Sequence, residues 1–404
     1  MPTSAMGSTI LLLASGIGTG VLVLPRTMAA VGYVPMLGLL FFGSCLSAFT
    51  TWMLFLAVAK TMRENQPGGQ ALLSQEPSRM DMSEPSYSDL LCSVTNSGGA
   101  ALLDVILVIY TLGTLTTYFL FVADFMQALT FWPDFLGTHA TIIIIGCIVL
   151  PSSIFQSVGT LSKLASAGLV SLLLMSVAIF IRMPSIVESH APYLVAVADI
   201  QRTPTAMCIA VYAFMWHTNC VGIARELQNP TPARCAMVSI AAPLLLALVY
   251  ASIAMGGYYS WGEELLEFKS IVSMYDKSDN LFVLVRLALI LGILVASGLN
   301  LYPVRESCVS LVRNRLPAEK LSHRIIWSLI LVGFVVALSI LFPDVVQIIT
   351  VLGGTFCSLL MILFPAMISR LVFGRAAWIV VLCLSVSIFA ALIASALGFI
   401  GRPV

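Results

Sequence analysis

Charged residues are scarce in this 404-residue sequence. Asp, Glu, Lys and Arg make up 10% of it, whereas a typical soluble domain carries about 25%. The formal net charge is +1, so the chain has no broad basic surface and nucleic acid is not an expected partner. Hydrophobic residues make up 59%, and the mean hydropathy is +1.01. We therefore predict an all-α polytopic membrane protein whose main surroundings are the lipid bilayer.

Motifs of catalysis and metal binding are also missing. The nine cysteines form no C-x-x-C pair, and the sequence has no H-E-x-x-H, no phosphate-binding P-loop and no paired intramembrane aspartates. These patterns mark the commonest metal sites and membrane hydrolases. We expect neither an enzyme nor a metal site or other cofactor. A channel is disfavoured because no charged pore stripe is visible.

Long apolar segments follow one another along the chain. A helix that crosses the bilayer needs about 20 apolar residues. On that measure we predict eleven spans, separated by short connections and by one longer polar connection, 61–99, which we expect to be a flexible loop. The spans are Thr9–Val31, Met36–Lys60, Ala100–Leu129, Thr141–Gln156, Lys163–Met183, Thr205–Leu227, Ala236–Tyr258, Asn280–Leu301, Ile325–Phe342, Val345–Ile368 and Trp378–Phe399.

Basic residues lie mainly on one side of these spans. They gather in the connections 60–79, 225–234, 305–324 and 370–375. Connections that remain in the cytosol carry an excess of Lys and Arg. The pattern predicts a cytosolic N-terminus.

The first span contains an unusual run near its centre. Gly16, Gly18 and Gly20 occupy every second position and Pro25 follows; glycine weakens a helix interior, and proline removes a backbone donor. Backbone opened at mid-membrane depth is tolerated only inside protein or against a water-filled cavity. The alternative is close helix packing, because Gly16 and Gly20 are small residues at spacing four.

The sixth span carries polar residues at its centre, His217, Thr218 and Asn219, which suggests a second break. Transporters with inverted repeats have broken helices at corresponding positions of the two halves. Spans one to five (9–183) and six to ten (205–368) would then form two five-helix repeats, with 378–399 as an appended eleventh helix. An odd number of helices per half gives the halves opposite topology, so the chain fits a 5+5 inverted repeat.

Two such breaks offer complementary charge. Freed amides at the start of a half-helix hold a carboxylate, and freed carbonyls at the end of a half-helix hold an ammonium group. Together they match an amino-acid zwitterion. The candidate substrate-binding residues of the first break are Ser15, Gly16, Ile17, Gly18, Thr19 and Gly20.

Four further side chains are candidates. His217 is an ionisable group at mid-span, suited to proton coupling or, alternatively, a neutral ring bonded to a backbone carbonyl. Tyr118 either places its hydroxyl on the substrate carboxylate or packs in the core. Phe214 either lines a pocket or is an ordinary core aromatic. Asp124 is either a coupling group or an interfacial carboxylate. Outside this set, Arg286 is expected to extend toward the aqueous boundary.

Several segments resemble one family in the right order along most of the chain. They are the glycine run with Leu22–Pro25 and Gly32, the stretch Tyr212–His217 with Glu226, Leu227 and Pro232, the stretches Val285–Ala288 and Tyr302–Arg305, and Gly353–Thr355 with Phe364–Ala366. This set resembles the amino acid/auxin permease family, which includes neutral amino acid transporters and vacuolar amino acid permeases. The resemblance implies a LeuT-like fold and secondary transport of amino acids by alternating access. It also implies that Ser15 to Thr19 contact the main-chain groups of the substrate and that Tyr118, Phe214 and His217 line the pocket.

The sequence departs from sodium-coupled members of that family at two positions. Those members carry an asparagine where Ala14 stands and a hydroxyl residue where we place Ala296; Ser297 is adjacent to the second position. This favours a proton-coupled or facilitative mode, with a proton as co-substrate, over a sodium-coupled symporter. The coupling candidates are His217, Asp124 and Ser297. We expect a monomer in the plasma membrane or in a vacuolar or lysosomal membrane, and the alternative to a permease is a non-transporting amino-acid sensor.

Overall fold

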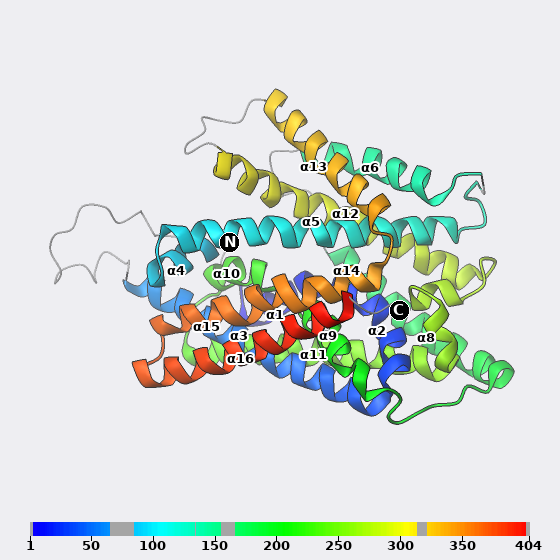
Figure 1. Cartoon of the computed structure of the whole chain (residues 1–404), viewed down its shortest axis with the longest axis horizontal. Helices are drawn as coiled ribbons and strands as arrows, with labels where there is room; N and C mark the ends of the chain where they lie inside the picture. Colours follow the sequence, from blue (N-terminus) through cyan, green and yellow to red (C-terminus); the bar gives the residue numbers. More distant parts are fainter. Residues whose placement is uncertain (1–2, 65–84, 134, 155–165, 313–320, 401–404) are drawn as a thin grey trace.

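The computed structural model describes residues 3–64, 85–133, 135–154, 166–312 and 321–400. Long helices dominate this part of the chain (Figure 1), and its one extended pairing is a single bridge between Thr3 and Leu227. Among these residues, nine helical segments are long and apolar enough to cross a membrane, or ten when the bent first pair is counted as one span. The prediction of an all-α, multi-pass membrane protein is confirmed.

Most predicted spans correspond to one long helix. The helix α6 (Thr138–Ile154) is shorter and corresponds to the predicted fourth span, whose last residue, Gln156, lies outside the described residues together with Lys163. The longer helices are α3 (Tyr33–Glu64), α5 (Ser97–Gln127), α8 (Ser166–His190), α11 (Pro232–Trp261), α12 (Asn280–Val312), α13 (Leu321–Leu341) and α16 (Arg375–Ile400).

Two spans are interrupted where the sequence predicts. The first consists of α1 (Ala5–Gly16) and α2 (Gly20–Val31), which meet at a bend of 67°. The sixth consists of α9 (Thr203–Ala213) and α10 (His217–Glu226). The first interruption falls on the predicted glycine run, and the second, at residues 214–216, directly precedes the polar centre of span six. The division into repeats 9–183 and 205–368, with an appended helix at 378–399, stays a prediction.

The tenth span is irregular in a way that the sequence analysis did not predict. It runs from α14 (Val345–Leu352) through two wide π turns, η5 (Gly353–Cys357) and η6 (Leu359–Leu363), into α15 (Phe364–Ile368) and a last turn, η7 (Ser369–Leu371). A Cβ atom added to Gly353 would lie 1.9 Å from the carbonyl oxygen of Cys208 in α9. The absence of a side chain therefore lets the two backbones touch where this helix widens.

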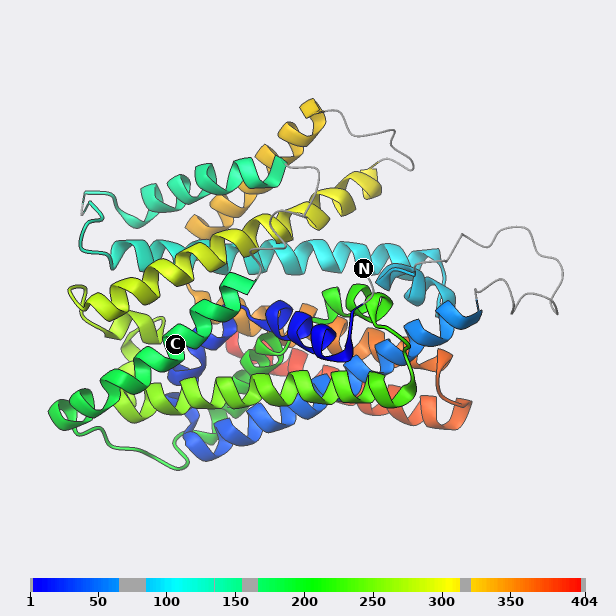
Figure 2. The same cartoon turned by 180° about the vertical axis from the view of Figure 1, so that it is seen from behind.

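The helices form two groups on either side of α5. In both views, α6 and α13 lie on one side of α5, α3, α11 and α16 lie on the other, and α12 crosses α5 from one side to the other (Figures 1 and 2). The half-helix α1 packs on α11, and the half-helix α10 packs on α3. Helix α8 joins the two groups because it packs on both α11 and α12. The broken helices consequently face α5 and α12 across the middle of the molecule.

Part of the connection 61–99 is ordered, so the prediction of a flexible loop is wrong for its last third. Helix α4 (Tyr87–Val94) begins with a capping box in which the side chains of Ser86 and Asp89 each bind the backbone N–H of the other residue. Two first-turn donors are thereby satisfied. The hydroxyl of Tyr87 also donates to the carbonyl of Leu360, at 2.6 Å, which fixes α4 against the tenth span.

The expectation for Arg286 is also wrong. Its side chain is fully buried and donates to the carbonyls of Val272, Tyr275 and Asp276. These residues belong to the connection 262–279, which contains the short helices η3 (Gly262–Glu267) and η4 (Ile271–Met274). Because this connection folds over the start of α12, the guanidinium group finds its acceptors there and does not reach solvent.

Candidate substrate site

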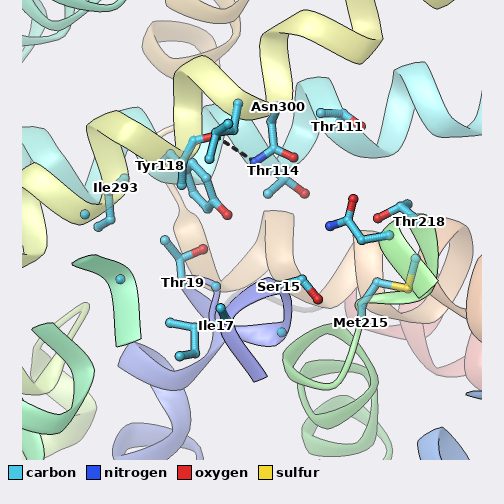
Figure 3. Close-up of a pocket in the computed structure, with 18 of the residues that line it drawn as sticks. Ser15, Ile17, Thr19, Thr111, Thr114, Tyr118, Met215, Thr218, Ile293 and Asn300 are labelled. Atoms are coloured by element: carbon cyan, nitrogen blue, oxygen red, sulfur yellow. Dashed lines mark hydrogen bonds between the residues drawn. The ribbon is translucent and has the colours of Figure 1, made fainter. Parts of the chain in front are cut away.

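A cavity of about 510 Å³ lies beside both helix breaks. Its walls come from α1, α2 and α10 on one side, and from α5, α8 and α12 on the other. Figure 3 shows side chains from these elements converging on the same space. The predicted substrate-binding residues that line it are Ser15, Gly16, Ile17, Gly18, Thr19 and Tyr118.

The three glycines of the first break have different surroundings. A Cβ atom on Gly16 would lie 2.3 Å from the ring of Trp216, and one on Gly20 would lie 3.0 Å from the Cα atom of Ala213. Both positions therefore permit close packing of the two broken spans, as the alternative interpretation predicted. Gly18 differs, because the nearest atom to its added Cβ would be the hydroxyl of Tyr118, at 4.0 Å. Gly18 and Tyr118 both line the cavity.

Helix ends of both signs meet at the cavity. The half-helices α2 and α10 begin beside it, and the N–H groups of their first two residues have no acceptor within the helix. The half-helices α1 and α9 end there, and their last carbonyls, at Gly16 and Ala213, face the hydroxyl of Tyr250. The helix macrodipole makes the starting ends positive and the finishing ends negative. The arrangement can hold a carboxylate at α2 or α10 and an ammonium group at α1 or α9.

Tyr250 of α11 bridges the ends of the two finishing half-helices. Its hydroxyl lies 3.0 Å from the carbonyl oxygen of Gly16 and 3.2 Å from that of Ala213. A hydroxyl has one proton, so the two carbonyls share a single donor. Each of these carbonyl oxygens has two lone pairs, so each can still accept from a bound ligand.

Three buried hydroxyls join α2, α5 and α9 next to the cavity. Thr19 and Thr117 lie 2.9 Å apart, and the hydroxyl of Tyr212 is 3.2 Å from each. All three are buried. This hydroxyl cluster (Thr19, Thr117 and Tyr212) ties the half-helices of both breaks to the long helix α5.

Phe214 and His217, which were predicted to bind the substrate, do not line the cavity. The ring of Phe214 is fully buried and packs against Tyr250, with 5.5 Å between ring centroids. His217 is also fully buried, with its Nε2 atom 2.8 Å from Thr50 Oγ1. Gly20 likewise does not line the cavity. The contact of these residues with substrate stays a prediction.

Thr50 is the hydrogen-bond partner of His217 Nε2. The Thr50 hydroxyl also lies 2.9 Å from the carbonyl of Leu46 and 3.2 Å from that of Ser47, so its single proton goes to one of these carbonyls when Nε2 carries the imidazole proton. The ring therefore binds a threonine hydroxyl, whereas the sequence alternative was a backbone carbonyl. Its Nδ1 atom is buried without a hydrogen-bond partner in the described part of the chain.

The other coupling candidates also lie away from the cavity lining. Asp124 accepts a hydrogen bond from Ser273 of η4. Ser297 is buried and donates to the carbonyl of Ile293, at 2.8 Å, one turn earlier in α12. Ala14 and Ala296, in contrast, both line the cavity. The wall therefore carries methyl groups at the two positions where the family resemblance implies sodium ligands.

The cavity includes polar residues that the sequence analysis did not select. Thr111 and Thr114 precede Tyr118 at spacings of seven and four, which places all three on one face of α5. Thr218 and Asn219 were noted beside His217 but not chosen. Asn300 of α12 had no local signal, since its place on the wall depends on how α12 packs against the breaks. All of these line the cavity.

Comparison with known proteins identifies relatives over the whole chain. The family model for the transmembrane amino acid transporter protein matches residues 1–401. Amino acid transporter AVT3A of Arabidopsis thaliana is 25% identical over 87% of this chain and 78% of its own. Vacuolar amino acid transporter 5 of Schizosaccharomyces pombe is 22% identical over 89% and 82%. Another relative, putative amino acid transporter AAT1 of Toxoplasma gondii, is 26% identical over 80% of this chain. The match covers only 42% of the length of that relative.

A solved structure shares the fold. The crystal structure of MhsT in complex with L-phenylalanine superposes with a TM-score of 0.60, covering 97% of this chain and 98% of MhsT at 10% sequence identity. This confirms the LeuT-like fold. The family match places the chain among transporters and not among enzymes. The chain belongs to the transmembrane amino acid transporter family.

Proposed function

We propose that the protein is a secondary transporter that carries amino acids across a membrane by alternating access. The observation that carries the proposal is the cavity beside both breaks, bounded by two positive and two negative helix ends. An amino acid presents a carboxylate and an ammonium group on one carbon atom. In this proposal the carboxylate binds at the start of α2 beside Tyr118, and the ammonium group binds at the end of α1 or α9.

The shape of the cavity supports one direction of opening. Leu11, Leu107, Ile223 and Val304 extend its wall toward the end of the molecule where α1 begins and α10 finishes. Those two ends lie together, since the N–H of Thr3 donates to the carbonyl of Glu226, at 2.6 Å. The hydroxyl cluster joins the helices next to the breaks. We infer a conformation that opens toward the N-terminal side, the cytosol in the predicted orientation.

We propose that transport is proton-coupled or facilitative. Ala14 and Ala296 contribute no side-chain oxygen to the cavity wall, at the two positions where the family resemblance implies sodium ligands. Sodium coupling is the second candidate. The observation that favours it is a relative named sodium-coupled neutral amino acid transporter 4, from Mus musculus, which is 28% identical over 41% of this chain and 30% of its own.

We also propose a vacuolar membrane as the site of action and a monomer as the transporting unit. The S. pombe relative, vacuolar amino acid transporter 5, supports the first point over a plasma-membrane location.

A thermal-shift screen of the detergent-purified protein tests this proposal. The melting temperature is measured with each of the twenty amino acids, at pH 5.5 and 7.5, with and without sodium. We expect stabilisation by a subset of amino acids that does not require sodium, because a ligand that binds the folded state raises its apparent stability. Stabilisation only in the presence of sodium would contradict the coupling proposal. No stabilisation by any amino acid would contradict the site itself.

A further inference from the structure

The side chains that line the cavity, among the residues the structure describes, are uncharged at neutral pH. Among the described residues that line it there is no Asp, Glu, Lys, Arg or His. A charged side chain brought into such a site would be buried without a counter-charge, at a large cost in free energy. If amino acids bind there, as proposed above, their side chains are uncharged.

Several polar side chains gather in one part of the cavity. Figure 3 shows Ile17 and Ile293 on one side, beside Thr19 and Tyr118, and four other polar side chains on the opposite side, near Met215. Asn219, the neighbour of Thr218 in the sequence, also lines the cavity. The polar end, as we call it, consists of Thr111 and Thr114 of α5, Thr218 and Asn219 of α10, and Asn300 of α12.

Two members of the polar end present fixed acceptors. The hydroxyl of Thr111 donates to the carbonyl of Leu107, at 2.7 Å, so its oxygen is left to accept. The side-chain nitrogen of Asn300 lies 2.8 Å from the carbonyl of Ala296. A carbonyl oxygen only accepts, so this contact requires the NH2 group there and leaves Oδ1 of Asn300 as an acceptor.

The other members retain uncommitted donors. Thr114 is 6% exposed, and its hydroxyl has no hydrogen-bond partner within the described ranges, although the hydroxyls of Tyr110 and Tyr212 are its polar neighbours. Nearly all buried polar groups in native proteins have a partner. Thr218 is half-buried and Asn219 is exposed, and neither makes a side-chain hydrogen bond to residues that the structure describes, so both can bind a ligand in the cavity.

We propose that the polar end is a subsite for a carboxamide side chain, such as that of L-glutamine or L-asparagine. A carboxamide supplies two donors and an acceptor on one planar group, which matches the acceptors of Thr111 and Asn300 and the donors of Thr114 and Asn219. A carboxylate could accept from those donors, but it has no donor for Thr111 and Asn300 and would be buried without a counter-charge. An aliphatic side chain would leave the buried Thr114 hydroxyl unpaired. Sites built to bond a polar substrate group discriminate strongly against analogues that lack it.

Uptake by the purified full chain in proteoliposomes tests this subsite. Initial rates are compared for L-glutamine, L-norleucine and L-glutamate, whose side chains have similar lengths but different chemistry. The variant Thr114→Val keeps the shape and removes the hydroxyl. The matched control is Thr116→Val, because Thr116 lies on the same helix, is buried, bonds the carbonyl of Leu112 and does not line the cavity. Asn219→Leu serves as a second, less buried variant.

We expect the wild type to prefer L-glutamine over L-norleucine by about tenfold or more, and Thr114→Val to reduce that ratio by about tenfold. Norleucine uptake should persist in Thr114→Val, and the control should keep the wild-type ratio. Equal wild-type uptake of glutamine and norleucine, or an equal loss for both in Thr114→Val and Asn219→Leu, would contradict the subsite. Uptake of other amino acids in that case would leave the proposed transport intact. Absence of uptake for every amino acid would contradict the transport proposal, and the subsite with it.

Discussion

At the scale of single residues, the sequence identifies the first break but not the task of each glycine. Spacing alone shows three glycines in a helix interior, with packing and binding as alternatives. In the structure, Gly16 and Gly20 allow close packing, because Gly16 lies against Trp216 and Gly20 lies against α9. Gly18 instead faces the cavity. Trp216 and Tyr118, which decide the roles of Gly16 and Gly18, lie far from the glycine run in the sequence. The spacing of the glycines therefore could not separate packing from binding.

Gly16→Ala should destabilise the fold. Its new methyl group would lie 2.3 Å from the ring of Trp216, and that ring is fully buried and held by a hydrogen bond from its Nε1 atom to Thr51. Overpacking of this kind costs roughly 1–3 kcal/mol. The check is the melting temperature in detergent. Gly18→Ala is the matched control and should melt near the wild-type temperature; equal melting of the two variants would show that the approach of Trp216 does not require glycine.

Tyr250→Phe should also lower stability. The change keeps the ring on Phe214 and removes the donor shared by the carbonyls of Gly16 and Ala213. Leaving a buried acceptor unsatisfied costs about 1–3 kcal/mol. Thermal melting of this variant is compared with that of Tyr259→Phe, an exposed tyrosine at the end of the same helix. A melting temperature equal to that of the control would mean that the bridge between the breaks adds nothing to stability.

At the scale of helices, apolar length and breaking residues predict most elements. Span positions follow from the bilayer's thickness, and both broken spans follow from glycine and polar residues at mid-span. Helix α4 carries a capping box, Ser86 with Asp89, that a closer look at the connection would have found. The π turns of the tenth span begin where Gly353 lies against α9, and a tertiary contact of that kind leaves no local pattern.

Asp344 caps the start of α14, since its side chain accepts from the N–H groups of Val346 and Gln347. Like the capping box of α4, this cap is visible in the sequence.

An ion pair joins α8 to the start of α12 and should make stability depend on acid pH. Burial alone would raise the pKa of Asp279, but the hydrogen bonds from Arg182 and from backbone N–H groups outweigh it, so the pKa lies below the ordinary carboxyl value. A lowered folded-state pKa adds stability above the unfolded value of about 3.8 and loses it as pH falls through the folded value.

Melting temperatures between pH 7 and pH 3 check this expectation. The wild type should lose more stability below pH 4 than Asp279→Asn, which lacks the titrating group. Glu263→Gln changes another acidic residue of the same side of the molecule and should follow the wild-type curve. An Asp279→Asn curve parallel to that of the wild type would show that the ion pair with Arg182 does not contribute.

At the scale of the whole molecule, the fold class follows from composition and from the order of the spans, and the similarity to MhsT confirms it. The cavity wall is less predictable. Residues of the first break and Tyr118 were selected from the sequence, but Phe214 and His217 lie outside the lining, and Asn300 enters it only through the packing of α12. A helix's period tells which residues share a face, but not which neighbour that face meets.

Uptake of radiolabelled amino acids into proteoliposomes that contain the wild type, Gly18→Ala or Gly18→Leu tests whether amino acids are carried through the site at the first break. Position 18 points toward the Tyr118 hydroxyl with space around it, so a leucine should fill the substrate space without disturbing the fold. We predict uptake by the wild type, without a requirement for sodium, and its loss in Gly18→Leu at an unchanged melting temperature, with Gly18→Ala intermediate or unaffected. Wild-type vesicles that take up no amino acid with or without a pH gradient, or a Gly18→Leu variant that transports like the wild type, would contradict the account.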